Sequence, residues 1–193
     1  MNTVALDRYG ALVREYHRTL DLVSPAALND WDSLLADALL YGELIDELLP
    51  AAGAVLDLGS GVGLPGIPLA CTRAGLAVRL VERRRRRSAF LNLVTGQLGL
   101  ANLSVDAADV SDVTGHTADV ITAQAVGRFA DVYALTRHLH AGEVLLVSSK
   151  GSDWQDEAAE LEQRTGVSVS ASAVRSRSAG TGLVVGILMP GGR

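Results

Sequence analysis

The chain has 193 residues, of which 48% are hydrophobic and 20% charged, and its formal net charge is −5. This length fits a single domain, and the apolar content excludes a disordered chain. No apolar stretch reaches the roughly 18 residues of a membrane-spanning helix, and the first residues lack the layout of a secretory signal. We therefore expect a cytoplasmic protein with no membrane partner.

The composition also disfavours disulfides and metal sites. Cys71 is the single cysteine, which excludes an intramolecular disulfide and a multi-cysteine zinc site. The four histidines show no metal-ligand spacing, so we expect no bound metal. Cys71 itself is best interpreted as a small buried hydrophobic residue rather than a nucleophile.

The predicted elements change character near residue 50. Two helices are expected first, around residues 6–16 and 26–49, because apolar residues recur there at helical spacing. Short apolar runs then predict strands, and helical patterns lie between most of them. The strand candidates are 54–58, 77–81, 103–105, 119–122, 143–148, 167–171 and 183–188, and the helical patterns are 66–73, 84–98, 129–139 and 153–164.

This alternation predicts an α/β fold with a seven-stranded, mostly parallel sheet and helices on both faces. The last two strand candidates are joined only by a loop, so a hairpin should make one strand antiparallel. We expect residues 1–50 to form a helical N-terminal cap and residues 51–193 to form the main domain as one compact unit.

A glycine-rich turn follows the first predicted strand. Gly59, Gly61 and Gly63 alternate there, with Asp57 two residues before the first, and Glu82 ends the next strand. Glycines permit positive φ and close approach of a ligand to the backbone, and a carboxylate in that place can accept both hydroxyl protons of a ribose. The plain alternative is a tight strand-to-helix turn. A nicotinamide-binding oxidoreductase is a second alternative, although the dinucleotide fingerprint places its third glycine one residue further on.

This pattern resembles that of the class I S-adenosylmethionine (SAM) methyltransferases, which have a Rossmann-like fold. The resemblance implies that the glycines pass under the methionine end of SAM and that Glu82 holds the ribose. It places Asp109 beside the adenine, although Asp109 is also suited to cap a helix. The cofactor-binding residues implied in this way are Asp57, Gly59, Ser60, Gly61, Gly63, Glu82, Arg83, Ala108, Asp109 and Gln124.

The longer string from Asp57 to Ala70 is more specific. It resembles the small-subunit ribosomal RNA guanine-N7 methyltransferase family, also called the glucose-inhibited division protein B family. Ser88–Leu91 and Lys150-Gly151 resemble further family motifs. The departures fall on the substrate side: Ala123-Gln124-Ala125 stands for the family's Ser-Arg-Ala, and Thr181-Gly182 stands for its Arg-His. Two N-terminal family motifs survive only in part, at residues 21–23 and 32–33.

These losses leave the methyl acceptor open. Arginine forks and histidines suit phosphate and guanine recognition, so their absence narrowly favours a small-molecule acceptor. One alternative is guanine N7 of small-subunit ribosomal RNA. Another is a SAM-binding regulatory protein without catalysis. We place Gln124, Arg128 and Lys150 at the acceptor or catalytic side, because they follow strands at the sheet edge where ligands bind. Guanine N7 has no proton to lose, so no general base is required.

The basic residues are concentrated in one segment. Residues 73–87 hold seven arginines against one acid, including the run Arg83–Arg87. One interpretation is a patch that neutralises RNA phosphates. The other is a solvated helix face, because five consecutive residues point around a whole helix.

Overall fold

A computed structural model describes residues 3–177 and 182–190 of the chain. Three helices come first, followed by alternating strands and helices. The helices are α1 (Thr3–Leu20), α2 (Pro25–Asn29), α3 (Trp31–Leu48), α4 (Gly66–Thr72), α5 (Arg85–Leu98), α6 (Phe129–Thr136), α7 (Trp154–Thr165) and the 3-10 turns η1 (Val110–Asp112) and η2 (Arg137–Leu139). The strands are β1 (Ala54–Leu58), β2 (Ala77–Val81), β3 (Leu103–Asp106), β4 (Ala118–Ala123), β5 (His140–Lys150), β6 (Ala171–Ser176) and β7 (Leu183–Met189).

The seven strands form one sheet in the order β3-β2-β1-β4-β5-β7-β6. The five strands from β3 to β5 are parallel to their neighbours, and β7 is antiparallel to both β5 and β6. The strand order reverses between β1 and β4, because the chain first extends to β3 and then returns to the other side of β1. Such a switch point opens a crevice at the carboxyl ends of the strands, where ligands of α/β sheets bind. The predicted fold class and closing hairpin are confirmed.

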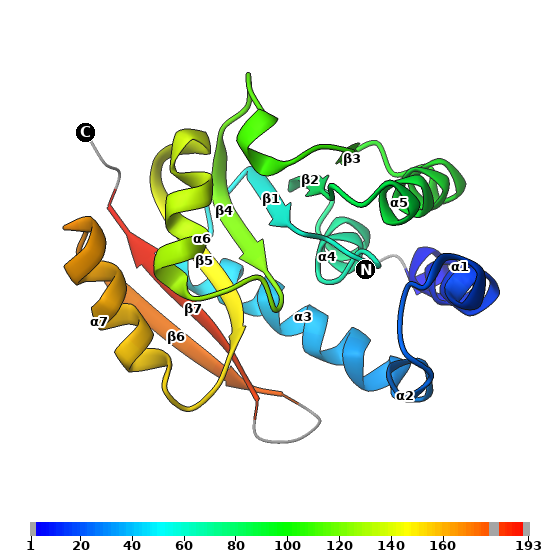
Figure 1. Ribbon diagram of the computed structural model, residues 1–193, viewed down its shortest axis with the longest axis horizontal. Coiled ribbons are helices and arrows are strands. Elements are labelled where there is room, and N and C mark those ends of the chain that lie inside the picture. Colours follow the sequence, from blue (N-terminus) through cyan, green and yellow to red (C-terminus); the bar gives the residue numbers. More distant parts are fainter. Residues whose placement is uncertain (1–2, 178–181, 191–193) are drawn as a thin grey trace.

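Helices cover both faces of the sheet, as Figure 1 shows. One core cluster joins α1, α3, α4 and α5 to one face of the sheet, and a second joins α6 and α7 to the other face. The connection from β3 to β4 contains only the short turn η1. None of the helices in residues 3–177 and 182–190 combines the length and apolar character of a membrane span.

The N-terminal helices share their core with the sheet. Tyr9 of α1 and Trp31 of α3 are buried, and their rings meet edge to face with centroids 5.3 Å apart. The same apolar cluster contains Leu44 of α3 and Val184 of β7. The division of the chain at residue 50 stays a prediction, and the packing makes the cap continuous with the main domain.

The structure differs from the expected elements most clearly in two places, and elsewhere mainly in where elements begin and end. The helix expected over 26–49 is interrupted at Asp30, which caps α2 and begins α3 with non-helical dihedral angles. This break lets Trp31 turn inward against Tyr9. The sixth strand covers 171–176 rather than 167–171, because its register is set by β7, with Ser176 opposite Leu183. Thr181, one of the substrate-side departures, lies outside the described residues.

Candidate functional site

The glycine turn connects β1 to α4 at the carboxyl edge of the sheet. Gly59, Gly61 and Gly63 have φ values of 66°, 59° and 109°, a region that side chains disfavour. The backbone N–H groups of Gly59 and Ser60 donate to the Val81 carbonyl at 2.9 and 3.1 Å, so the turn is held against the end of β2. These glycines are therefore required by the backbone of the turn, as the sequence pattern indicates.

A second contact holds the turn from the N-terminal cap. The Tyr9 hydroxyl of α1 is buried and donates to the Val62 carbonyl at 3.1 Å. Burial of the hydroxyl raises the pKa of Tyr9 well above its usual value, with the neighbouring Asp57 carboxyl adding to the effect. Tyr9 therefore stays protonated and can act as a donor throughout the physiological range.

Asp57 lies behind the turn and has no exposed surface. Its Oδ1 accepts a hydrogen bond from the Thr122 hydroxyl of β4 at 2.6 Å, and its Oδ2 has no hydrogen-bond partner among the described residues. Burial raises the pKa of Asp57 to about 6, and the Thr122 bond opposes that rise. Gly66 is required nearby, because an added Cβ would lie 2.8 Å from Asp57 Oδ2. Asp57 of β1 is thus hydrogen-bonded to β4 through Thr122 and lies close against Gly66 at the start of α4.

Glu82 brings its carboxylate to the turn from the end of β2. Its Oε2 accepts from the Gly61 backbone N–H at 3.0 Å, and its Oε1 accepts from the Arg84 backbone N–H at 2.8 Å. The residue is only 5% exposed, yet it lines the cleft described next. The carboxylate is consequently fixed in orientation before any ligand arrives.

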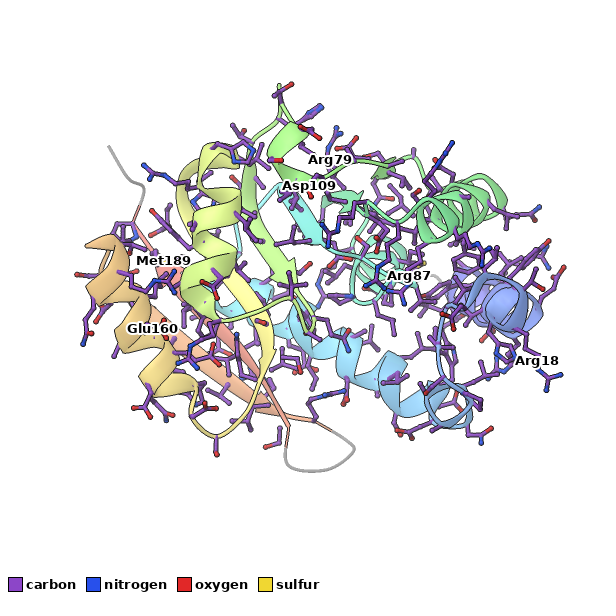
Figure 2. The ribbon with its side chains drawn as sticks, in the orientation of Figure 1. Arg18, Arg79, Arg87, Asp109, Glu160 and Met189 are labelled. Atoms are coloured by element: carbon purple, nitrogen blue, oxygen red, sulfur yellow. The ribbon has the colours of Figure 1, made fainter. Side chains whose placement is uncertain are left out.

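A cleft of about 500 Å³ opens over the carboxyl ends of β1, β2 and β4. Six of the ten residues expected to bind cofactor line it, namely Gly59, Glu82, Arg83, Ala108, Asp109 and Gln124. The other four, Asp57, Ser60, Gly61 and Gly63, build the turn around Gly59. Further lining comes from Arg84, Arg87, Val126 and Leu135, which the sequence argument did not assign to the cofactor. Figure 2 shows Asp109 beside η1 and Arg87 between α4 and α1.

Asp109 combines the two roles that the sequence left open. Its side chain accepts from the Ser111 backbone N–H at 3.2 Å and caps η1. The Ser111 hydrogen bonds, with a smaller contribution from Arg83 at 3.6 Å, hold the pKa of Asp109 below its usual value. The cap is observed, and the place of Asp109 in the lining leaves its contact with the cofactor as a prediction.

The residues expected on the acceptor side lie in and around the loop between β4 and α6. Ala125 and Gly127 have positive φ values of 57° and 141°, which give this loop a specific turn. Gln124 lines the cleft. Arg128 does not line it, and its Nε donates to Glu160 Oε2 of α7 at 2.5 Å. The structure therefore brings Gln124 to the cleft and directs Arg128 toward α7.

Lys150 is buried beneath the same loop. Its Nζ donates to the Gly127 carbonyl at 2.7 Å and to Glu157 Oε2 at 2.7 Å, and lies 4.4 Å from the centre of the Phe129 ring. Glu157 also accepts from the Phe129 backbone N–H at 3.2 Å. The ammonium thus ties the acceptor loop to α7. This geometry favours a positioning role, and contact of Lys150 with an acceptor stays a prediction.

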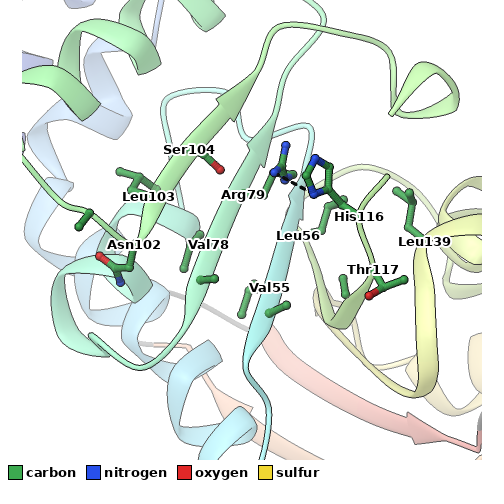
Figure 3. Close-up of a pocket in the computed structure, with 14 residues that line it drawn as sticks. Val55, Leu56, Val78, Arg79, Asn102, Leu103, Ser104, His116, Thr117 and Leu139 are labelled. Carbon is green, nitrogen blue, oxygen red and sulfur yellow. Dashed lines mark hydrogen bonds between the residues drawn. The ribbon is translucent and has the colours of Figure 1, made fainter. Parts of the chain in front are cut away.

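A second cavity, of about 200 Å³, lies at the amino-terminal parts of β1 to β4 (Figure 3). Arg79 points into it, donating to Asp106 at 2.8 Å and approaching His116 Nδ1 at 3.1 Å. This cavity is at the opposite end of the strands from the glycine turn. We therefore assign the cofactor to the larger cleft, where the topology predicts ligand binding.

Two features of the site had no signal in the sequence. Thr122 and Tyr9 each contact the glycine turn or its acid from more than 50 positions away along the chain. Their apolar surroundings mark them as core residues, and only the fold shows their polar partners.

Among the described residues, no group of three or more His, Cys, Asp or Glu side chains is arranged to hold a metal ion.

The chain has the architecture of the class I methyltransferases. A family model described as GidB, rRNA small subunit methyltransferase G, matches residues 2–182. The chain belongs to this family, and the recognition from the sequence motifs is confirmed. The expected cofactor, SAM, is that of the methyltransferase class to which the family belongs.

Individual relatives agree with this assignment. The chain is 40% identical over 131 residues to a Ribosomal RNA small subunit methyltransferase G of Kineococcus radiotolerans, a match that covers 67% of this chain and 50% of that relative. It is 35% identical over 190 residues to the same enzyme of Bradyrhizobium sp. strain BTAi1, covering 94% and 82%. The match thus spans half the length of the first relative.

The solved structures agree on the fold. Magnesium protoporphyrin IX methyltransferase from Synechocystis PCC 6803, with bound S-adenosylhomocysteine (SAH), superposes with a TM-score of 0.61 at 14% identity, covering 93% of this chain and 99% of that one. At this identity the similarity concerns the fold alone. The names of the two sequence relatives favour the ribosomal RNA acceptor over the small-molecule acceptor that the missing arginine and histidine narrowly favoured.

Proposed function

We propose that this protein transfers the methyl group of SAM to guanine N7 of small-subunit ribosomal RNA. The observation that carries the proposal is the cleft at the switch point, lined by Gly59 of the turn and by the fixed carboxylate of Glu82, in a chain of the rRNA methyltransferase G family. An enzyme of ribosomal RNA acts where ribosomes are assembled, so the proposal includes a cytoplasmic location.

The residues present fit the cofactor. The glycine turn exposes backbone without side chains, and an added Cβ at Gly59 would approach Val126 at 3.2 Å. Glu82 would accept the ribose hydroxyls, Asp109 would lie at the adenine, and Asp57 would support the turn from behind. Bound SAM supplies an electrophilic methyl group on a sulfonium.

The chain's own contribution is chiefly positional. Guanine N7 presents a lone pair and loses no proton, so the protein needs to align the base and exclude water rather than supply a general base. Gln124 lines the cleft and offers an amide that can hydrogen-bond a base edge. Lys150 and Glu157 hold the loop that carries Gln124. Gln124 stands where the family has an arginine. This replacement agrees with a role in contacting the base, provided that other residues hold the RNA backbone.

The proposal is tested with labelled SAM. Isolated small ribosomal subunits and a small-molecule extract of the producing cells are compared as acceptors, and labelled RNA is mapped for N7-methylguanine. Label at one guanine N7 supports the proposal. Label only in the extract would establish the small-molecule alternative, and SAM binding without turnover on either acceptor would select the regulatory one.

Variants of the acceptor side sharpen the result. Gln124→Ala should raise the KM for the RNA if its amide contacts the acceptor, whereas a loss of SAH affinity would assign the side chain to the cofactor. Arg128→Ala tests the second acceptor-side prediction in the same assay. Gln155→Ala, on the exposed side of α7, is the matched control and should leave both constants unchanged. If Gln124→Ala and Arg128→Ala both behave like the control, the placement of the acceptor pocket is wrong.

A further inference from the structure

The arginine run forms an exposed surface at the rim of the cofactor cleft. Arg83 and Arg84 precede α5, and Arg85, Arg86 and Arg87 form its first turn. The first four are exposed and Arg87 is partly buried. Arg83, Arg84 and Arg87 line the cleft, whereas Arg85 and Arg86 are next to them in the chain and do not line it. We call these five residues the arginine rim.

The arginine rim is poorly neutralised by the protein itself. Ten ion pairs connect described residues, and the only one that reaches the rim joins Arg83 to Asp109 at 3.6 Å, with both side chains substantially exposed. Within the described part of the chain, Arg84 to Arg87 have no acid within ion-pair distance. Most other described arginines do have such partners, as Arg73, Arg79, Arg128, Arg164, Arg175 and Arg177 show.

The location makes this excess charge unfavourable for the free protein. A helix N-terminus carries a partial positive charge, so acids and capping oxygens stabilise it and cations destabilise it. The start of α5 has no acid in its first turn and no side-chain cap, and it holds the arginine rim instead. A merely solvated helix face would not concentrate like charges at the positive end of a helix. An anion bound there would be favoured by both the guanidinium groups and the free N–H groups.

We propose that the arginine rim binds the phosphate backbone of the RNA whose guanine enters the cleft. This proposal rests on the proposed function, because the partner is inferred from the acceptor. An enzyme that modifies a base in an unstacked nucleotide takes the base into its pocket and leaves the backbone at the rim. Arg85 and Arg86 are exposed beside the arginines that line the cleft, and guanidinium forks bind phosphate through two parallel hydrogen bonds.

The arginine rim provides positive charge beside a cleft that lacks one of the family's arginines. The family's arginine after the fourth strand is replaced by Gln124 in this chain, which lines the cleft and carries no charge. The net charge of −5 opposes association of RNA with the molecule as a whole. Binding of an RNA backbone therefore depends on a local cluster of cations, and the arginine rim is the strongest one in the sequence.

The test uses Arg85→Gln/Arg86→Gln, because these two residues do not line the cleft and form no ion pair with a described acid. Binding of deproteinised small-subunit ribosomal RNA is measured from 50 to 200 mM salt, with SAH present. Each lost phosphate contact lowers the slope of log Kd against log salt by roughly 0.7–0.9, so the double variant should lower it by about 1.5. Over this range the wild-type Kd should rise about eightfold more than that of the variant.

The control, Arg8→Gln/Arg137→Gln, removes the same charge elsewhere. Arg8 contacts Gln97 near the far end of α5, Arg137 follows α6, and neither residue lines the cleft. The control should keep the wild-type slope, and an equal change in both variants would show a general charge effect and overturn the assignment. The rim variant should also melt at the same or a higher temperature, whereas a structural role for the rim would lower it.

The remaining outcomes separate this proposal from the function on which it rests. A wild-type slope in the rim variant overturns the arginine rim even if guanine N7 is methylated. A reduced slope without methyl transfer to the RNA supports the rim and contradicts the proposed function. If poly-glutamate of equal charge competes as well as RNA, the rim is a general polyanion surface and its assignment to RNA is wrong.

Discussion

The buried pair of Lys150 and Glu157 gives a prediction whose magnitude follows from its surroundings. The Lys150 side chain is 3% exposed and the Glu157 side chain 10% exposed. Lys150→Met would leave the Glu157 carboxylate with the Phe129 N–H as its one partner in the part of the chain that the structure describes. Removing one member of a buried ion pair costs about 3–5 kcal/mol, because the other charge stays buried without compensation. For a domain of this size the melting temperature should fall by about 6–20 °C.

A double variant separates the buried charge from the lost lysine. Lys150→Met/Glu157→Gln removes the uncompensated charge and keeps an amide oxygen for the Phe129 N–H. The remaining loss is the partner of the Gly127 carbonyl, worth about 1–2 kcal/mol. Urea unfolding should therefore show the double variant to be about 2 kcal/mol more stable than Lys150→Met. Equal stabilities within about 0.5 kcal/mol would refute the reasoning.

The same pair of variants tests the catalytic prediction for Lys150. If Lys150 only positions the loop, methyl transfer should recover together with stability in the double variant, and the affinity for SAH should stay that of the wild type. If the ammonium contacts the acceptor, the double variant should remain as inactive as the single one despite its recovered stability.

Three further predictions follow from the site and its surroundings. Gly66→Ala should cost about 1–3 kcal/mol by urea unfolding, because its Cβ would lie 2.3 Å from a leucine methyl of β2. Gly96→Ala, with nothing within 4 Å of its Cβ, should instead stabilise by about 0.5–1 kcal/mol, and the opposite order of the two would contradict the packing. Burial, with smaller effects of His138 and Arg137, lowers the pKa of His140 to about 4. Between pH 6.5 and about 4, His140 is therefore protonated in the unfolded chain but neutral in the folded chain. Stability should fall across that window as the pH falls, and His140→Gln should reduce this fall when melting curves are compared with the wild type. Asp57 titrates in the same window with the opposite sign, which is why only the difference between the two proteins is diagnostic. Glu82→Gln should weaken SAH binding by calorimetry about tenfold, a change of 1.4 kcal/mol, and an unchanged affinity would remove Glu82 from the ribose site.

The sequence predicts the sheet well because periodicity and glycine spacing are local. The strands 54–58 and 77–81 agree with β1 and β2 residue for residue, since each is a short, mostly apolar run interrupted by a single charged residue. The sixth strand is displaced because residues 167–171 also alternate apolar and small residues. Its position is decided by hydrogen bonds to β7, a partner that follows it along the chain. Propensity alone carries no information about that register.

The site shows the same limit. The glycines and Glu82 are recognisable because a tight turn and a strand end require particular residue types. Lys150 is different, because its burial depends on Glu157 from the next helix and on the Gly127 carbonyl from the preceding loop. An isolated lysine after a strand is expected at the surface. Only the packing of three segments shows that its charge is compensated inside the protein.

The hydrogen bond from Tyr9 to Val62 has a consequence for the energetics of ligand binding. Because the bond joins α1 to the glycine turn, opening of the helix and disorder of the turn are parts of one local unfolding equilibrium. A ligand that binds only the ordered turn then also stabilises the docking of α1, and by reciprocity undocking of α1 lowers the ligand's affinity by the same coupling free energy. Hydrogen exchange in α1 should therefore slow as SAH saturates the protein, so that the amides of the first helix report on cofactor occupancy from outside the cleft.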